Sequence, residues 1–212
     1  MEICYYDTLK STQSYLIEAI LSKKLNTPIL IYTHNQTQGI GSRQNEWHGI
    51  KGNLFFSFAL DCNMLADDLP LPSISIYFGY IIKDILSSLG SSLVLKWPND
   101  LYLDNKKIGG LITNKKTDFI VVGVGINLVN IKDDFHNLDI NLDILNFFDI
   151  LIDKINNRIS WSSIFKLYKV EFYKSNFNYK VRNHKKSFCL KDAVLNKDGS
   201  ISVNNEKVYS LR

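Results

Sequence analysis

The stretch LVLKWPNDLYLDNKKIGGLIT, from Leu93 to Thr113, carries much of the information about the fold. It predicts a strand over 93–97, which Pro98 ends because proline cannot donate a hydrogen bond to a neighbouring strand. Asp104-Asn105-Lys106 is typical of a tight turn, and a second strand follows over 107–113. Together these segments predict a β-hairpin.

Outside this hairpin, the spacing of apolar residues predicts further helices and strands. Ser11 is a candidate N-cap for a helix that runs to about Leu25. Helical spacing also predicts a helix over 74–89 that Gly90 closes, and two helices between 142 and about 173 that break near Ser160. Short apolar runs predict strands over 29–33, 53–60 and 119–127.

The order of these elements favours the α+β class, with a mixed β-sheet packed with helices, because strands and helices do not alternate strictly. Beyond residue 176, alternating stretches over 187–195 and 200–209 are joined by the turn Asn196-Lys197-Asp198-Gly199. They predict a small β domain. The expected domains are therefore residues 1–175 and 176–212.

Composition excludes several classes of protein. The 212 residues carry a net charge of only +4, far from the basic stripe of a dedicated nucleic-acid binder. Cys4, Cys62 and Cys189 form no C-x-x-C pair, which argues against a disulfide scaffold and favours a reducing cytoplasm. No run of about 18 apolar residues predicts a membrane span. The four histidines are isolated in sequence, so no permanent metal site is predicted.

The hairpin stretch also carries chemistry. Lys96, Asn99 and Asp100 supply a cation, an amide and a carboxylate beside the stiff turn at Pro98. Lys107 stands two residues before a Gly-Gly pair on the next strand. This pattern is typical of preorganised polar groups next to exposed backbone.

The segments KWPND and KKIGG closely resemble the signature of biotin protein ligases. Four other segments agree in order and spacing: Ser11-Thr12-Gln13 at the first helix, the loop QTQGIGSRQNEW from Gln36 to Trp47, Gly52-Asn53-Leu54 with Ser57, and Gly123-Val124-Gly125-Ile126-Asn127-Leu128. The resemblance covers most of residues 11–128. It departs from the family at the loop arginines, whose positions hold Ile40 and Ser42, and Arg43 is the candidate replacement.

The resemblance implies a class II synthetase-like catalytic domain of the biotin/lipoate ligase superfamily, followed by a small SH3-like β-barrel. It implies an enzyme of the biotin–[acetyl-CoA-carboxylase] ligase type. Such an enzyme makes biotinyl-5′-adenylate and pyrophosphate from biotin and ATP with Mg²⁺, and then acylates a lysine of a carrier protein.

Residue roles follow from the same resemblance. Lys107, Arg43 and Asp100 are the expected catalytic residues. The role of Asp100 stays open between accepting a proton from the acceptor lysine and orienting a substrate. The expected biotin-binding residues are Ser11, Thr12, Gln36, Gly39, Gly41, Trp97, Lys107 and Gly110, and those for ATP and Mg²⁺ are Trp47, Asn99 and Asn127.

The expected partners are biotin, ATP and a biotin carboxyl carrier domain of acetyl-CoA or pyruvate carboxylase. Only ten residues precede Ser11, too few for a helix-turn-helix, so a role on DNA is not expected. A membrane is not an expected partner either. The resemblance leaves open a homodimer through an edge of the main sheet. The polar loop over 38–45 is expected to be mobile when empty and to become ordered over biotin or the adenylate.

Two alternatives compete with this interpretation. A lipoate or octanoate protein ligase or transferase shares the superfamily fold, but KWPND with KKIGG favours biotin. A non-catalytic module is the other alternative, since the chain is mildly basic, rich in aromatic residues and expected to end in an SH3-like barrel.

Overall fold

The computed structural model describes residues 1–41, 46–47, 49–129, 136–175, 179–183 and 186–209. The chain divides into two compact units. One unit is formed by Met1–Leu65 with Lys106–Asn141, and the other by Ala66–Asn105 with Leu142–Leu211. Both combine β-strands with at least one α-helix.

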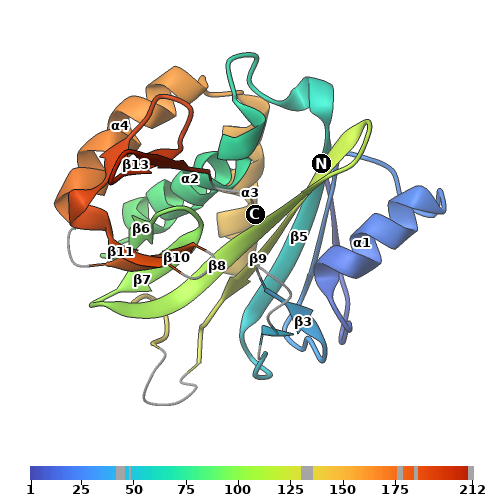
Figure 1. Cartoon of the computed structure of the whole chain (residues 1–212). Helices are drawn as coiled ribbons and strands as arrows, with labels where there is room; N and C mark the ends of the chain where they lie inside the picture. Colours follow the sequence, from blue (N-terminus) through green and yellow to red (C-terminus); the bar gives the residue numbers. More distant parts are fainter. Residues whose placement is uncertain (42–45, 48, 130–135, 176–178, 184–185, 210–212) are drawn as a thin grey trace. The chain divides into compact units, whose positions relative to one another are not determined.

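The first unit is built on a mixed β-sheet, visible in Figure 1. Its strands follow the order β1-β2-β5-β9-β8. Their bounds are Glu2–Tyr5 (β1), Ile29–Thr33 (β2), Leu54–Asp61 (β5), Lys106–Lys115 (β8) and Phe119–Ile126 (β9). Strand β1 runs parallel to β2, whereas the other neighbours are antiparallel, so the predicted mixed sheet is confirmed.

The two central strands of this sheet are almost wholly buried. All eight residues of β9 and seven of eight in β5 are buried, which explains why both strands appear in the sequence as continuous apolar runs. Helix α1, Thr12–Leu21, covers one face. The core beneath it contains Leu16, Ile29, Ile31, Ala59, Phe119 and Val121. A short hairpin of β3, Gly39–Ile40, and β4, Glu46–Trp47, completes the described β-structure of this unit.

Helix α1 begins where the sequence predicts and ends four residues earlier. The Ser11 side chain accepts a hydrogen bond from the Ser14 N–H at 3.4 Å, which confirms the N-cap. The helix ends at Leu21 rather than Leu25 because Lys23 adopts a left-handed φ of 59°. Two hydrogen bonds back to Ala19 and Ile20 complete a Schellman ending there.

The second unit contains three α-helices: α2, Ile74–Ser88; α3, Ile144–Asn156; and α4, Trp161–Ser175. Short 3₁₀ segments lie at Cys62–Met64 in the first unit, and at Leu71–Ser73 and Leu190–Asp192 in the second. Eleven of the 15 residues of α2 are buried, and the other four are the charged or polar Lys83, Asp84, Ser87 and Ser88. Gly90 follows this helix with a φ of 108°, which confirms its predicted role as the C-terminal stop.

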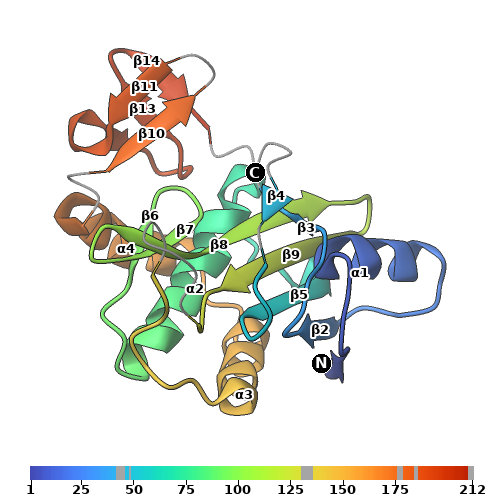
Figure 2. The same ribbon diagram turned by 90° about the horizontal axis from the view of Figure 1, so that it is seen from below.

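The β-strands of the second unit are short. Strands β6, Val94–Lys96, and β7, Asp100–Leu103, form an antiparallel pair. The C-terminal strands, grouped together in Figure 2, are β10, Lys180–Asn183; β11, Lys186–Cys189; β12, Val194–Leu195; β13, Ile201–Val203; and β14, Glu206–Val208. They pair as β10-β11 and β12-β13-β14, which confirms a small C-terminal β-structure.

Both predicted C-terminal stretches are more divided than the sequence indicates. The 3₁₀ helix Leu190–Asp192 interrupts the first, and a turn at Asn204-Asn205, with φ values of 49° and 63°, splits the second. Asparagine tolerates this left-handed conformation. The turn at 196–199 is confirmed. An SH3-like barrel and a domain boundary at residue 175 stay predictions.

Among the residues that the structure describes, no helix is both long enough and apolar enough to span a lipid bilayer.

Candidate functional site

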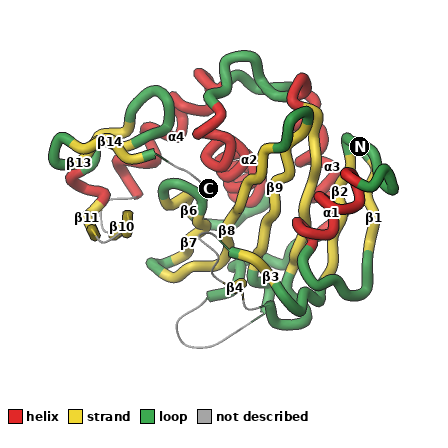
Figure 3. The backbone as a smooth tube through the Cα atoms, turned by 45° about the vertical axis from the view of Figure 1, so that its right-hand side comes forward, coloured by secondary structure: helices red, strands yellow, loops and turns green. Residues whose placement is uncertain are grey.

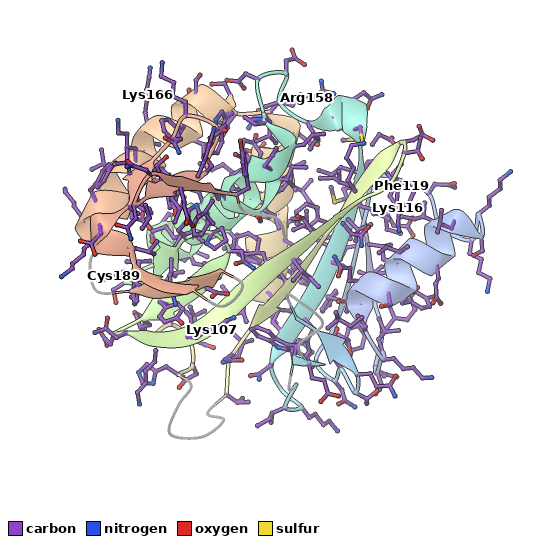
Figure 4. All side chains as sticks on the ribbon, viewed as in Figure 1. Lys107, Lys116, Phe119, Arg158, Lys166 and Cys189 are labelled. Atoms are coloured by element: carbon purple, nitrogen blue, oxygen red, sulfur yellow. The ribbon has the colours of Figure 1, made fainter. Side chains whose placement is uncertain are left out.

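Lys107 lies near the start of β8, and Figure 4 shows it at the opposite end of this strand from Lys116. Its side chain is half-buried, and its Nζ atom lies 5.0 Å from the centre of the Trp47 ring. An ammonium group at this distance makes a cation–π interaction with an indole. The carbonyl oxygen of Ile108 accepts a hydrogen bond from the Asn127 N–H at 2.7 Å. Lys107 therefore lies close to two other predicted site residues.

Trp47 packs against β9 at a point where only glycine fits. It pairs with Gly39 in the β3–β4 hairpin, which Figure 3 shows beside the ends of β8 and β9. A Cβ atom on Gly125 would lie 2.8 Å from the Trp47 ring, closer than side chains tolerate. The Trp47 Nε1 atom is buried and has no hydrogen-bond partner among the described residues. Because buried N–H groups normally have a partner, this donor is one that a bound ligand can satisfy.

A pair of asparagines holds the backbone that follows β9. Asn53 Oδ1 accepts hydrogen bonds from the N–H groups of the two residues after Asn127, at 2.9 and 3.1 Å. Asn53 Nδ2 donates to Asn127 Oδ1 at 3.5 Å, and Asn127 Nδ2 donates to the His136 carbonyl oxygen at 3.3 Å. The His136 N–H in turn donates to the Lys107 carbonyl oxygen at 3.4 Å. The asparagine pair therefore fixes the surroundings of the Lys107 backbone.

A second polar cluster lies between α1 and the sheet. Gln36 Oε1 accepts hydrogen bonds from the N–H and the hydroxyl of Thr12, at 2.9 and 3.2 Å. Thr12 Oγ1 accepts one from the Ser57 hydroxyl at 2.9 Å. All three residues are buried, and Ser11 beside them is buried as well. Buried polar groups cost free energy unless they are paired, so these hydrogen bonds stabilise a polar cluster between α1 and an otherwise apolar sheet.

The second unit holds the predicted residues that follow β6. Trp97 is fully buried, and its Nε1 donates a hydrogen bond to the Gly199 carbonyl oxygen at 2.8 Å. Asn99 is buried and Asp100 half-buried at the start of β7. Trp97 is thus a core residue whose polar edge binds the C-terminal turn. That its ring also lines a biotin pocket stays a prediction.

The predicted site residues fall into three groups. The first unit contains Ser11, Thr12, Gln36, Gly39, Gly41, Trp47, Lys107, Gly110 and Asn127. The second contains Trp97, Asn99 and Asp100. Arg43 and part of the loop over 38–45 lie outside the described residues, so their expected roles stay predictions.

Two contributors are missing from the predicted site residues. Ser57 belongs to the buried cluster with Thr12, and Asn53 positions the segment after β9. Ser57 interrupts the run Leu54-Phe55-Phe56 and Phe58-Ala59-Leu60, and a lone hydroxyl in such a run is the signal that marks it. Asn53 precedes the same run and is itself fully buried. Both lie in a motif that the resemblance already includes.

These groups define what the first unit can do chemically. The Lys107 ammonium supplies positive charge that can stabilise an anion. Gly110 and Gly125 pair across β8 and β9, and the Trp47 ring covers Gly125. The Thr12 cluster provides hydroxyl and amide groups for a polar head. The arrangement suits an anionic ligand that also carries hydrogen-bonding groups.

The chain is similar to known proteins in both sequence and structure. The sequence model of the Biotin/lipoate A/B protein ligase family matches residues 5–127. The crystal structure of biotin acetyl coenzyme A carboxylase synthetase from Helicobacter pylori with bound biotinylated ATP is similar over 98% of this chain and 99% of that chain, with 38% identity and a TM-score of 0.92.

Two curated relatives are similar over shorter stretches. Biotin–protein ligase 2 of Arabidopsis thaliana is 38% identical over 106 residues, which are 45% of this chain and 31% of that protein. The bifunctional ligase/repressor BirA of Bacillus spizizenii is 27% identical over 142 residues, 63% of this chain and 42% of that protein. The chain thus matches less than half the length of either relative. The family match covers more than half of the chain, and the chain belongs to the biotin/lipoate A/B protein ligase family.

Proposed function

We propose that this chain is a biotin protein ligase that works in two steps. In the first, a carboxylate oxygen of biotin attacks the α-phosphorus of ATP, the bond to the β-phosphate breaks, and pyrophosphate leaves. In the second, the ε-amine of a carrier lysine attacks the acyl carbon of biotinyl-5′-adenylate. An amide forms, AMP leaves with the electron pair of the acyl–oxygen bond, and the amine loses a proton.

The observation that carries this proposal is the position of Lys107. Its ammonium lies over the Trp47 ring, and its backbone carbonyl oxygen accepts a hydrogen bond from His136, whose own carbonyl oxygen binds the Asn127 side chain. The first step brings a carboxylate to an anionic phosphate, so positive charge and positioning must supply most of the catalysis. The likeness to a relative whose structure holds biotinylated ATP supports the same substrates.

The remaining groups of the first unit fit the two substrates. The Thr12, Gln36 and Ser57 cluster offers donors and acceptors for the ureido ring of biotin. The Trp47 N–H, which has no partner among the described residues, and the adjacent ring suit adenine or the adenylate phosphate. Arg43, Asp100 and Asn99 would act on the phosphates and the acceptor lysine. Asp100 would either accept the lysine proton or orient a substrate.

Mg²⁺ fits this donor set as an ion that the nucleotide carries. Among the described parts of the chain, no three His, Cys, Asp or Glu side chains gather closely enough to hold a metal ion. The amide oxygen of Asn127 already accepts a hydrogen bond from Asn53. Amide groups here can therefore give the ion single contacts at most. Mg²⁺ keeps several waters and binds phosphate oxygens readily, and there it would neutralise phosphate charge.

The name of the Helicobacter pylori relative supports acetyl-CoA carboxylase as the source of the carrier domain, with pyruvate carboxylase as the other candidate. Cys4, Cys62 and Cys189 are not joined in disulfides, which supports the reducing cytoplasm as the location. Pairing of two copies through a sheet edge also remains a proposal.

Pyrophosphate release with alternative acids tests this function. We expect release from ATP and magnesium only when biotin is added, and none with lipoate or octanoate. Pyrophosphate release with lipoate but not biotin would show that the chain is a lipoate ligase instead. Release with neither acid would contradict ligase chemistry altogether.

A further inference from the structure

Three successive carbonyl oxygens in the turn between β12 and β13 accept hydrogen bonds from distant side chains. The pairs are Trp161 Nε1 with Lys197 at 2.8 Å, Ser73 Oγ with Asp198 at 2.5 Å, and Trp97 Nε1 with Gly199 at 2.8 Å. The three donors come from the start of α4, the start of α2 and the end of β6. We call residues 196–200 and these three donors the carbonyl clamp.

The turn itself has little freedom. Gly199 has a φ of 74°, and a Cβ atom there would overlap the Ser73 side chain. Asn196 Nδ2 donates to the hydroxyls of Ser200 and Ser202 at 3.0 and 2.9 Å. The carboxylate of Asp198 accepts from Ser200 at 2.6 Å and pairs with Lys207 at 2.8 Å. A rigid acceptor of this kind can fix the orientation of an indole that binds to it.

The two residues before Trp97 are also held by partners from outside β6. The Leu95 N–H donates to Glu171 of α4 at 2.9 Å, and Glu171 also pairs with Lys83 of α2 at 2.6 Å. Lys96 Nζ lies 4.5 Å from the ring centre of Tyr102 and 5.4 Å from that of Tyr179. Leu95, Lys96 and Trp97 are therefore each fixed from outside their own strand.

We propose that the Gly199 carbonyl oxygen of the carbonyl clamp positions the predicted catalytic segment, acting through the Trp97 side chain. Trp97 stands two residues before Asn99 and three before Asp100, so the bond that anchors its side chain also restrains the backbone that leads to both. Gly199 is then a positioning residue of the reaction although it lies 102 residues further along the chain. This inference deepens the proposed ligase function and depends on it.

The chain offers a matched pair of variants that separates positioning from stability. Trp97→Phe and Trp161→Phe each remove one hydrogen bond from a buried indole N–H to a carbonyl oxygen of the same turn. Both bonds have a donor–acceptor distance of 2.8 Å. We expect both variants to lower the melting temperature. Only Trp97→Phe lowers kcat of biotin-dependent pyrophosphate release, by about 10- to 100-fold, because a misplaced catalytic group costs rate at this scale. The KM for biotin should change by no more than about twofold.

Gly199→Ala extends the test to the other side of the hydrogen bond. Gly199 acts through Trp97 in this proposal. The double variant that combines Trp97→Phe with Gly199→Ala should therefore lose no more kcat than the worse of these two single variants, as expected of coupled residues. If Gly199→Ala fails to fold, Ser73→Ala takes the place of this variant in the test. It removes the hydrogen bond to the adjacent Asp198 carbonyl oxygen without adding volume. Additive losses in kcat, or equal losses in the two Trp→Phe variants, would overturn the proposal.

Hydrogen exchange of the indole N–H groups tests the clamp without any turnover. In Gly199→Ala or Ser73→Ala, we expect exchange at Trp97 to accelerate at least as much as exchange at Trp161. Unchanged protection at Trp97 overturns the inference. A wild-type chain that does not turn over biotin overturns the proposed function, and with it the positioning role. The exchange result then decides separately whether Gly199 holds Trp97.

Discussion

At Gly125 the fold leaves no room for a side chain, and this has a consequence for substrate binding. A Cβ atom there would lie 2.8 Å from the Trp47 ring, so Gly125→Ala pushes the indole away from β9 and changes its contact with the Lys107 amine. If Trp47 contacts adenine, the variant loses an aromatic contact of about 1 kcal/mol, or about fivefold in kcat/KM for ATP. Steady-state kinetics with varied ATP measure this loss.

Gly123→Ala is the matched control for that variant. Gly123 lies on the same strand, and an added Cβ atom there would meet its nearest neighbours at 3.2–3.3 Å, a contact that small shifts relieve. We expect this variant to keep the wild-type kcat/KM for ATP within about threefold. An equal loss in both variants would show that the effect comes from β9 itself and not from Trp47.

Elements were predictable where one residue type determines the local backbone. Ser11 as N-cap, Gly90 after α2 and the Asp104-Asn105 turn, with φ values of 46° and 65°, all follow from local chemistry. The end of α1 did not, because a lysine occupies the left-handed position that glycine usually marks. The pair Asn204-Asn205 could have predicted a turn, since asparagine tolerates positive φ. The hairpin was not predicted because the strands on either side of the turn are short.

The turn between β12 and β13 also gives the fold a dependence on pH. Burial alone would raise the pKa of Asp198, but hydrogen bonds from Lys207 and Ser200 outweigh it and leave the pKa below its ordinary value of 3.8. A carboxyl group with a lowered pKa binds its proton more weakly in the folded state than in the unfolded state. Its contribution to stability is therefore complete above about pH 4 and is lost as the pH falls through the folded-state pKa.

Urea denaturation at pH 7 and pH 3 measures this contribution. The Asp198 side chain is 34% exposed, so we expect less than about 1 kcal/mol in the free energy of unfolding. Asp198→Asn should reduce the difference between the two pH values, and Lys207→Ala should reduce it as well, because Lys207 is the strongest partner of the carboxylate. A pH dependence that neither variant changes would exclude Asp198 as its source.

For the whole molecule, the sequence indicated the chemistry of the site better than its construction. Ordered motifs brought Thr12, Gln36, Lys107 and Asn127 into one candidate site, and the structure places all four in the first unit. The place of Trp97 in a pocket wall stays a prediction, and the hydrogen bond from its N–H to Gly199 was not predicted. A contact across 102 residues depends on how the chain returns on itself, and local pattern contains no information about that.

Formation of biotinyl-5′-adenylate tests the role of Lys107 most directly. The wild-type chain, mixed with biotin, ATP and magnesium and then denatured, should release the adenylate, which mass spectrometry detects. Lys107→Ala should form it at least about 100-fold more slowly, since one preorganised charge near the transition state is worth this much. Lys115→Ala, at the far end of the same strand, should match the wild type. Adenylate formed by Lys107→Ala at the wild-type rate would contradict the account.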